Sequence, residues 1–440
     1  MQNKRLFIIA ILVLITLLLV VFGFAVVRLI SGDGAEGQGD SVVFPESEEV
    51  NQDLLREANF LFGTSSERYV MEGNGTRPAP DFRALTTEPS VGIVVTERDT
   101  TLGSSTPFVR YVNQENGHVY ELPLSVVGNE KELTKKTVLR VAAASLSQSG
   151  SSTLLQYHSD IGDVHTYLGT LQQPAPTSSE PGVYLLDGTT LANNITSTAF
   201  SPSGEHVLYV QRGQDGATIY KESLMTGDKI VLWSSLLRNV HVAWPHEASV
   251  LVYTNPTSIA EGLVFTLNPD TGVDQVVLGG EFALAGKQDP TAQRLLYSLQ
   301  EQVGGVVSLR VLEQETGKTT YLEPATVVEK CVWGPSGSVY IYCAVPREPI
   351  VGTMLEDWYM GKVHTDDVIW RFNTFTGGAT MLLDPLTEVE QRFDIVDLVV
   401  SPSEEYLVLR TKVNNVLWSL RLPEDTQPAA GSGEVTDEAG

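Results

Sequence analysis

The stretch "FSPSGEHVLYV" (200–210) decides the fold, because its arrangement of residues returns along the chain. Close copies are "WGPSGSVYIYC" (333–343) and "VSPSEEYLVLR" (400–410), and weaker copies are "AWPHEASVLVYT" (243–254) and "KQDPTAQRLLYS" (287–298). Successive prolines of the five copies are 43, 45, 45 and 67 residues apart: Pro202, Pro245, Pro290, Pro335 and Pro402. A recurrence of about 45 residues predicts a repeat architecture.

A second turn signal supports the same period. Each of the first four copies is followed by a Thr-Gly pair, and the first three pairs are 45 residues apart: Thr226-Gly227, Thr271-Gly272, Thr316-Gly317 and Thr376-Gly377. Near these signals apolar and polar residues alternate, as in "HVLYV" (206–210) and "VLWSLRL" (416–422), which is typical of half-buried strands. Four short strands in a period of about 40–45 residues are the signature of a β-propeller blade.

We therefore expect an all-β propeller over residues 81–422, with seven four-stranded blades and with six or eight as alternatives. Fainter strand patterns at 91–97, 108–124 and 139–169 supply two upstream blades. The last repeat ends near residue 422 after three strands. We expect "DFRALTTEP" (81–89) to supply its outer strand, because closure by an N-terminal strand removes an open sheet edge.

The repeated "SPSG…LYV…TG" unit resembles that of WD40-like and TolB-like bacterial β-propellers. A narrower likeness lies in "KCVWGPSGSVYIYCAVP" (330–346), "DWYMG" (357–361) and "DVIWRFN" (367–373), which look like uncharacterised bacterial propeller proteins with a single membrane anchor. The resemblance implies the propeller architecture, and the likeness to TolB implies a periplasmic protein partner. It supplies no catalytic residues. Two features set this chain apart from TolB: its repeats are irregular, and its N-terminal apolar run (6–27) is expected to be retained as a membrane anchor. TolB's specific partners are therefore not assigned to this chain.

An uncharged apolar run (6–27) precedes the repeats. As a helix it spans roughly 33 Å, close to the thickness of a hydrocarbon core, and no A-x-A cleavage signal follows it. Lys4 and Arg5 lie before the run, so the positive-inside rule places the N-terminus in the cytoplasm and the propeller on the extracytoplasmic side. We expect a stub with a single-pass transmembrane anchor (1–30), an acidic linker with a short helix (31–80), the propeller (81–422) and a disordered acidic tail (423–440).

Both cysteines lie around one short turn, in "KCVWGPSGSVYIYC" (330–343). If "GPSG" (334–337) forms a β-turn, its flanks pair as antiparallel strands, and Cys331 faces Cys343 within disulfide range. A compartment outside the cytoplasm lets such a pair persist as a disulfide. The alternative is two buried free thiols.

One repeat carries an insertion. Pro335 and Thr376 are 41 residues apart, whereas the other copies use 24–26, and about fifteen extra residues fall in "REPIVGTMLEDWYMGKVHTDD" (347–367). Loops on a rigid scaffold often carry function, and Trp and Tyr are favoured at binding hot spots. We therefore expect partner-binding residues here: Trp358, Tyr359, Asp357 and His364. The alternative is that Trp358 and Tyr359 fix the loop onto the propeller.

The segment "YHSDIGDVHTY" (157–167) is a weak metal-site candidate. In a hairpin that turns at 161–162, four ligand-type side chains would share one face: His158, Asp160, Asp163 and His165. Hairpin tips also use Asp and Gly for turn geometry alone, so we predict no metal. The sequence has no P-loop, G-x-G-x-x-G or G-x-S-x-G motif, and we assign no catalytic residue and no cofactor.

The net charge of −25 argues against nucleic-acid partners, because so acidic a surface repels a phosphate backbone. We expect a membrane-anchored extracytoplasmic scaffold that binds another protein of the cell envelope, rather than an enzyme. The alternative is a propeller that binds or cleaves carbohydrate through carboxylates in its central funnel.

Overall fold

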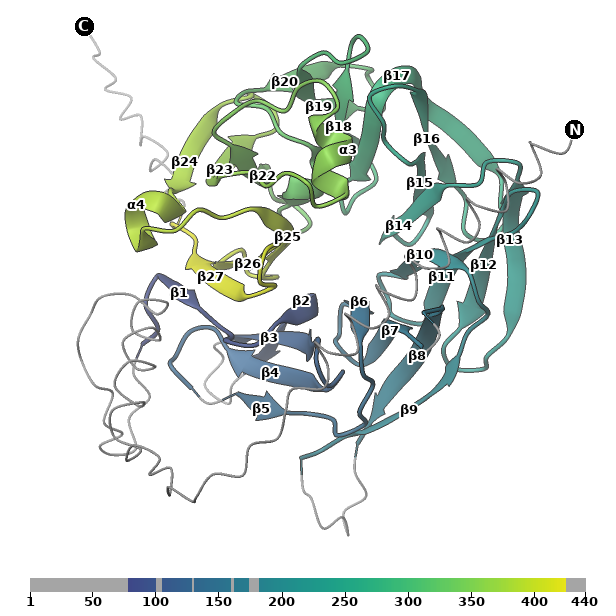
Figure 1. Cartoon of the computed structure of the whole chain (residues 1–440), viewed down its shortest axis with the longest axis vertical. Coiled ribbons are helices and arrows are strands. Elements are labelled where there is room, and N and C mark those ends of the chain that lie inside the picture. The colour runs from purple at the N-terminus through teal and green to yellow at the C-terminus, as the bar shows by residue number, and fades with distance from the viewer. Residues whose placement is uncertain (1–77, 100–104, 129, 160–161, 174–181, 425–440) are drawn as a thin grey trace, which may run out of the picture. The chain divides into compact units, whose positions relative to one another are not determined.

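The computed structural model describes residues 78–99, 105–128, 130–159, 162–173 and 182–424. These residues form antiparallel sheets that resemble propeller blades and surround a common centre (Figure 1). The predicted anchor, most of the linker and nearly all of the acidic tail lie outside the described residues. Within the described ranges, no helix is long and apolar enough to cross a membrane.

The strands fall into six sheets. The first contains β2 (Ser90–Asp99), β3 (Ser105–Asn113), β4 (Val119–Pro123) and β5 (Lys131–Glu132). The second contains β6 (Val141–Leu146), β7 (Ser152–His158), β8 (Val164–Gln172) and β9 (Leu185–Thr190), and the third contains β10 (Ile195–Phe200), β11 (His206–Arg212), β12 (Ala217–Ser223) and β13 (Lys229–Ser235). A seven-stranded sheet follows, with β14 (Val240–His246), β15 (Ser249–Thr254), β16 (Glu261–Leu267), β17 (Asp274–Gln288), β18 (Arg294–Gln300), β19 (Val307–Glu313) and β20 (Thr319–Leu322).

The remaining two sheets have four strands each. One contains β21 (Cys331–Trp333), β22 (Tyr340–Pro346), β23 (Asp367–Asn373) and β24 (Ala379–Leu383), and the other contains β25 (Ile395–Val400), β26 (Tyr406–Thr411), β27 (Leu417–Arg421) and β1 (Phe82–Ala84). Three short helical segments lie between strands: the 3-10 helix η1 (Val328–Lys330), α3 (Met354–Tyr359) and α4 (Pro385–Val389).

The seven-stranded sheet consists of two four-stranded units that share the 15-residue strand β17. Its first half pairs with β16, from Asp274 to Phe282, and its second half pairs with β18, from Phe282 to Gln288. The register shifts between Phe282 and Ala285, where Ala283 has a φ of +50°. Because of this irregularity, the first half of β17 is the outer strand of one unit and the second half is the inner strand of the next unit.

The repeated turns predicted from the sequence connect the first two strands of five units. In the turn after β10, Ser201 Oγ accepts hydrogen bonds from the backbone N–H groups of Glu205 (3.1 Å) and His206 (3.0 Å), and Ser401 repeats this pattern after β25. The Thr-Gly pairs lie between the third and fourth strands, where Gly227, like its three counterparts, has a φ near +70°. The same turn-forming residues therefore recur at equivalent places in successive units, which accounts for the repeat seen in the sequence.

The N-terminal strand closes the last sheet, which confirms the prediction for 81–89. Strand β1 pairs antiparallel with β27, with Phe82 opposite Leu420. The Phe82 ring also stacks on Trp418 at a centroid distance of 5.0 Å. Since β2 in turn contacts β25, the first and last sheets are neighbours and the ring is complete (Figure 1).

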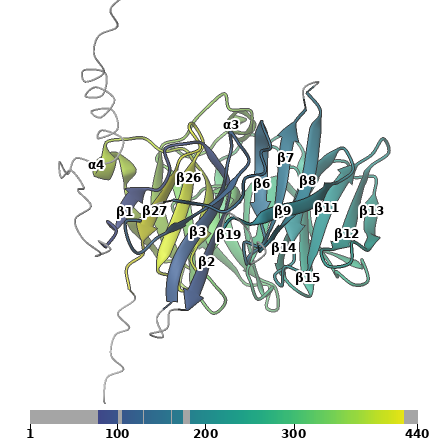
Figure 2. The same ribbon diagram turned by 90° about the horizontal axis from the view of Figure 1, so that it is seen from below.

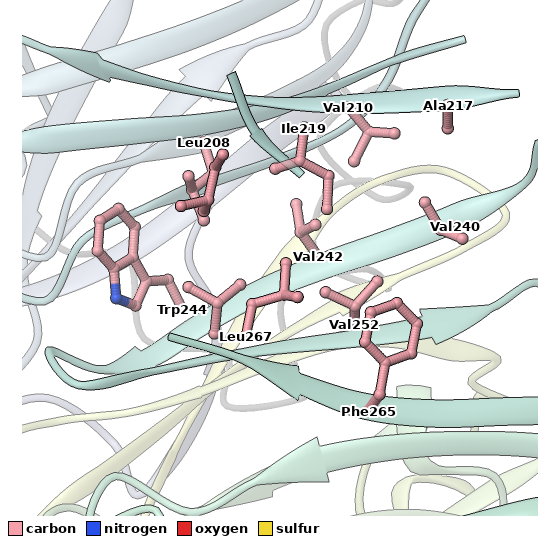
Figure 3. Packing of buried hydrophobic residues seen from close by; sticks show 12 residues of the cluster. Leu208, Val210, Ala217, Ile219, Val240, Val242, Trp244, Val252, Phe265 and Leu267 are labelled. Atoms are coloured by element: carbon pink, nitrogen blue, oxygen red, sulfur yellow. The ribbon is translucent and has the colours of Figure 1, made fainter. Parts of the chain in front are cut away.

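The hydrophobic core lies between successive sheets. Figure 3 shows one such layer, in which Leu208 and Ile219 of the third sheet face Val242, Val252 and Phe265 of the next. All five side chains are at most 7% exposed. A single sheet cannot bury both of its faces, so radial packing against two neighbours supplies the burial that each sheet needs.

The two cysteines form a disulfide, as the sequence predicted. Cys331 and Cys343 lie directly opposite each other on β21 and β22, and both are buried. The hydrogen-bonded turn between these strands runs from Pro335 to Ser338, one residue later than expected.

Removal of this disulfide should destabilise the protein. The bridge closes a loop with a sequence separation of 12, for which loop-closure entropy predicts about 3 kcal/mol. We expect the double variant Cys331→Ala/Cys343→Ala to lose that much free energy of unfolding in urea titrations. Non-reducing peptide mapping of the wild type should recover the two cysteines linked, and two free thiols would contradict the bond.

Candidate functional site

The insertion predicted from the sequence forms a structured loop between β22 and β23. We call residues 347–366, which contain α3, the cap. We call the upper face the side that carries the loops between the second and third strands of the sheets. Figure 2 shows α3 on this face, together with the end of the β7–β8 hairpin.

The cap is attached to a sheet other than its own. Val351 forms an isolated β-bridge with Val306 in the loop between β18 and β19. On α3, Glu356 Oε1 accepts hydrogen bonds from Thr257 Oγ1 (2.7 Å) and from the backbone N–H (2.6 Å) and hydroxyl (2.8 Å) of Ser258. Burial alone would raise the pKa of Glu356, but these hydrogen bonds outweigh it and hold the pKa below its ordinary value. The cap therefore reaches both units of the seven-stranded sheet.

A buried ion network lies beneath the cap. The Lys330 ammonium is fully buried and donates to Asp367 Oδ2 (2.6 Å), Asp394 Oδ1 (2.8 Å), Thr365 Oγ1 (2.9 Å) and the carbonyl of Ile395 (2.8 Å). Thr365 belongs to the cap, Asp367 begins β23 and Asp394 immediately precedes β25. One ammonium thus connects the cap to the third strand of its own sheet and to the inner strand of the next sheet.

The two aspartates of this network have opposite pKa shifts. Burial raises the pKa of Asp367 above its ordinary value, and the Lys330 charge offsets this only in part. For Asp394 burial also acts upward, but the Lys330 charge and hydrogen bonds from Lys330, Trp358 and Thr365 outweigh it, so the pKa lies below its ordinary value. Both carboxyl groups lie within ion-pair distance of the Lys330 ammonium.

Trp358 holds the cap against this network. Its indole N–H donates to both carboxylate oxygens of Asp394, at 2.8 and 3.1 Å. The ammonium groups of Lys330 and Lys412 lie 4.6 and 4.1 Å from its ring centroid, within the range of cation–π attraction. Because the side chain is only 4% exposed, we leave Trp358 out of any partner surface. This buried position of Trp358 agrees with the alternative considered from the sequence, in which the residue fixes the loop onto the propeller.

The other three residues expected to bind a partner remain accessible. Tyr359 is 39% exposed, although its hydroxyl donates to Glu329. The His364 side chain is half exposed, with Nδ1 3.2 Å from Asp394 Oδ2. Asp357 is about one-third exposed. His364 thus adjoins the buried network, and all three side chains are partly exposed on the cap.

Exposed apolar side chains surround the cap on the upper face. Ile259 follows the serine that α3 binds, and Val413 follows Lys412, whose ammonium donates to the carbonyl of Trp358. Val351 and Met360 belong to the cap itself. We call the following set, each member of which is between 42% and 71% exposed, the cap surface: Ile259, Val303, Val306, Val351, Met360 and Val413. They come from four separate loops, so no local sequence pattern identifies them.

The β7–β8 hairpin does not bring the predicted metal ligands together. In the observed register His158 pairs with Val164, and His165 pairs with Tyr157. Adjacent positions of a strand point to opposite faces, so the two histidines do not share a face and the expectation of a shared face is wrong. Asp160 lies outside the described residues. No cluster of three or more metal-ligating side chains occurs in the part of the chain that the structure describes.

Comparison with solved structures finds β-propeller folds at low sequence identity. An oligogalacturonate lyase from Vibrio parahaemolyticus is 9% identical, with 78% of this chain and all of that chain covered and a TM-score of 0.48. TolB from Acinetobacter baumannii is 10% identical, with 66% and 79% covered and a TM-score of 0.40. The tricorn protease is 11% identical, with 80% and 34% covered and a TM-score of 0.47. No family model matches the sequence, and no curated protein matches it at a significant level.

Proposed function

We propose that this chain is a membrane-anchored, extracytoplasmic binding module that recognises another envelope protein through the cap surface. We count seven blades, which are the five four-stranded sheets and the two units of the seven-stranded sheet. The apolar run at 6–27 supplies the anchor in this proposal, and the linker at 31–80 lets the propeller stand off the membrane. Tethering would raise its effective concentration near other envelope components.

One observation carries the proposal: a rigidly attached cap is surrounded by solvent-exposed apolar side chains. A buried ion network and a buried tryptophan fix the cap, so little conformational entropy is lost when a partner docks on it. Exposed apolar groups gathered on one face are typical of protein interaction sites. Tyr359 adds an aromatic side chain of the kind favoured at such sites.

The alternative, a carbohydrate-cleaving funnel, has weaker support. Such chemistry needs available carboxylates on the inner strands. Asp397, on the inner strand β25, is already paired with Arg410 through two contacts of 2.7 and 2.5 Å. This carboxylate is therefore not free for such chemistry.

Paired variants test the proposed surface. Val351→Asp/Met360→Asp places two charges on the cap surface, and Met381→Asp is the matched control, because Met381 is 55% exposed on the outer strand β24 of the same sheet. After crosslinking in intact cells, we expect one recurrent protein partner with the wild type and the control, and at least about a tenfold loss with the double variant. Equal recovery with all three proteins would contradict the proposal.

Protease accessibility tests the orientation. Protease added to intact spheroplasts should remove the propeller and leave a short membrane-bound fragment, because the charges around 6–27 favour a cytoplasmic N-terminus. Full protection of the propeller, with cleavage only after lysis, would contradict the extracytoplasmic placement.

A further inference from the structure

Two exposed arginines on the upper face lack carboxylate partners. In a chain with a net charge of −25, most described arginines form ion pairs with Asp or Glu. Arg212 and Arg238 have no such partner among the described residues, and the only polar contact of the Arg212 side chain there is a 3.4 Å hydrogen bond from Nη1 to Asn239 Oδ1. Two unpaired guanidinium groups are therefore available for an anion.

Both arginines line one groove at the third sheet, which reaches the second sheet at its smaller cavity. The groove consists of two adjoining cavities of about 620 and 450 Å³, which share Asn194 and Arg212. The larger cavity extends past Tyr220 to Arg238, and the smaller one extends to Asp163 at the end of the β7–β8 hairpin. The groove is thus elongated, with Arg238 in the larger cavity, Arg212 where the two cavities meet and the Asp163 carboxylate in the smaller cavity.

Carboxamide side chains in the groove are held in place by the backbone. Gln156 Nε2 donates to the carbonyl of Ile195 (3.1 Å), and Gln211 Nε2 donates to the carbonyl of Asn193 (3.0 Å). Among the described residues, none donates a hydrogen bond to their side-chain oxygens, which can accept from a ligand. The Tyr220 ring stacks against Tyr209 at 5.4 Å, which fixes the one aromatic surface of the lining. The groove therefore offers oriented donors and acceptors.

From this lining we propose that the groove binds an acidic oligosaccharide, with a carboxylate or sulfate group on Arg212 and Arg238. Guanidinium groups match the geometry of both anions through paired hydrogen bonds. Sugar hydroxyls both donate and accept hydrogen bonds. They can therefore pair with the fixed carboxamides, with the Thr218 hydroxyl and with the Asp163 carboxylate, which only accepts. A long polyanion would be repelled by the acidic surface beyond the groove.

Binding of defined oligosaccharides to the full-length protein in detergent tests this site. The probes are an alginate hexamer, which carries carboxylates, a heparin hexamer, which carries sulfates, and the neutral maltohexaose. We expect at least one acidic hexamer to bind, with affinity that falls as salt rises, and maltohexaose to bind at least about tenfold more weakly. The acidic hexamer that binds more tightly identifies the charged group.

Variants place the interaction in the groove. Arg212→Gln/Arg238→Gln should weaken the acidic hexamer at least about tenfold, while Arg392→Gln should not, because Arg392 is 75% exposed and pairs with Asp366 of the cap, away from the groove. The arginines of the groove are exposed, so thermal unfolding should be unchanged in both proteins. Three results would overturn the proposal: equal binding of maltohexaose, unchanged affinity of the double variant, or tighter binding of hexaglutamate than of either acidic hexamer. None of these depends on the cap surface.

Discussion

Replacement of Lys330 by Met should cost about 3–5 kcal/mol of the free energy of unfolding. Methionine retains most of the side-chain volume but removes the ammonium that Asp367 and Asp394 share. Removal of one partner of a buried ion pair leaves an uncompensated buried charge, and here it leaves two carboxylates. Urea denaturation at pH 7, with fluorescence of the buried tryptophans as the signal, measures the loss.

The pH dependence of the Lys330→Met variant gives a second, signed result. Without the ammonium, burial should raise the pKa of both carboxyl groups in the folded state above the value of about 3.9 in the unfolded chain. The folded state then binds more protons than the unfolded state, so stability rises as the pH falls. The defect relative to wild type should therefore shrink between pH 7 and about pH 4.

Lys362→Met is the matched control for this variant. Lys362 also carries a salt bridge in the cap, to Asp357 at 3.4 Å, but its side chain is 61% exposed. Exposed ion pairs contribute at most about 1 kcal/mol, so this variant should unfold close to wild type. A Lys330→Met protein as stable as the control would show that the buried network does not hold the cap.

Replacement of Trp358 by Ala should cost about 3–5 kcal/mol and release the cap. The substitution removes a large buried ring, the N–H donor to Asp394 and the contact with two ammonium groups. Protease cleavage within 347–366 should accelerate sharply, while the sheets stay intact at moderate temperature. Limited proteolysis followed by mass spectrometry locates the new cleavage sites, and thermal unfolding measures the loss of stability.

Two further variants separate the ring from its donor. Trp358→Phe retains most of the buried area and should lose about 1.5–3 kcal/mol, the value of a hydrogen bond to a charged group. Tyr359→Phe removes only the hydroxyl bond to Glu329 from a side chain that is 39% exposed, so its effect should be smaller. If Trp358→Ala leaves cleavage of the cap unchanged, the ring does not anchor it.

The propeller could be predicted from the sequence because the turn signals that define it each lie within a short stretch of the chain. The serine and proline of "FSPSGEHVLYV" (200–210) form a side-chain-capped turn, and Gly227 adopts the positive φ that its turn requires. Each signal recurs near a 45-residue period, so independent turns support one architecture. The pairing of Cys331 with Cys343 followed from the same hairpin geometry.

The buried network could not be predicted, because its residues are far apart in the sequence. Lys330 meets Asp394 across 64 residues, and Glu356 meets Ser258 across 98. Nothing in a local window distinguishes these residues from solvated charges. The hairpin at His158 and His165 failed for a different reason: a one-residue difference in register moves a side chain to the other face of a strand.

Site-specific photocrosslinking in intact cells tests the central claim most directly. A photoreactive amino acid replaces Met360 on the cap surface in one strain and Met381 on β24 in another, two positions of similar exposure. We predict that position 360 yields a discrete crosslinked band containing one envelope protein, and that position 381 does not. No adduct at position 360, or the same adducts at both positions, would contradict recognition of a protein partner through the cap surface.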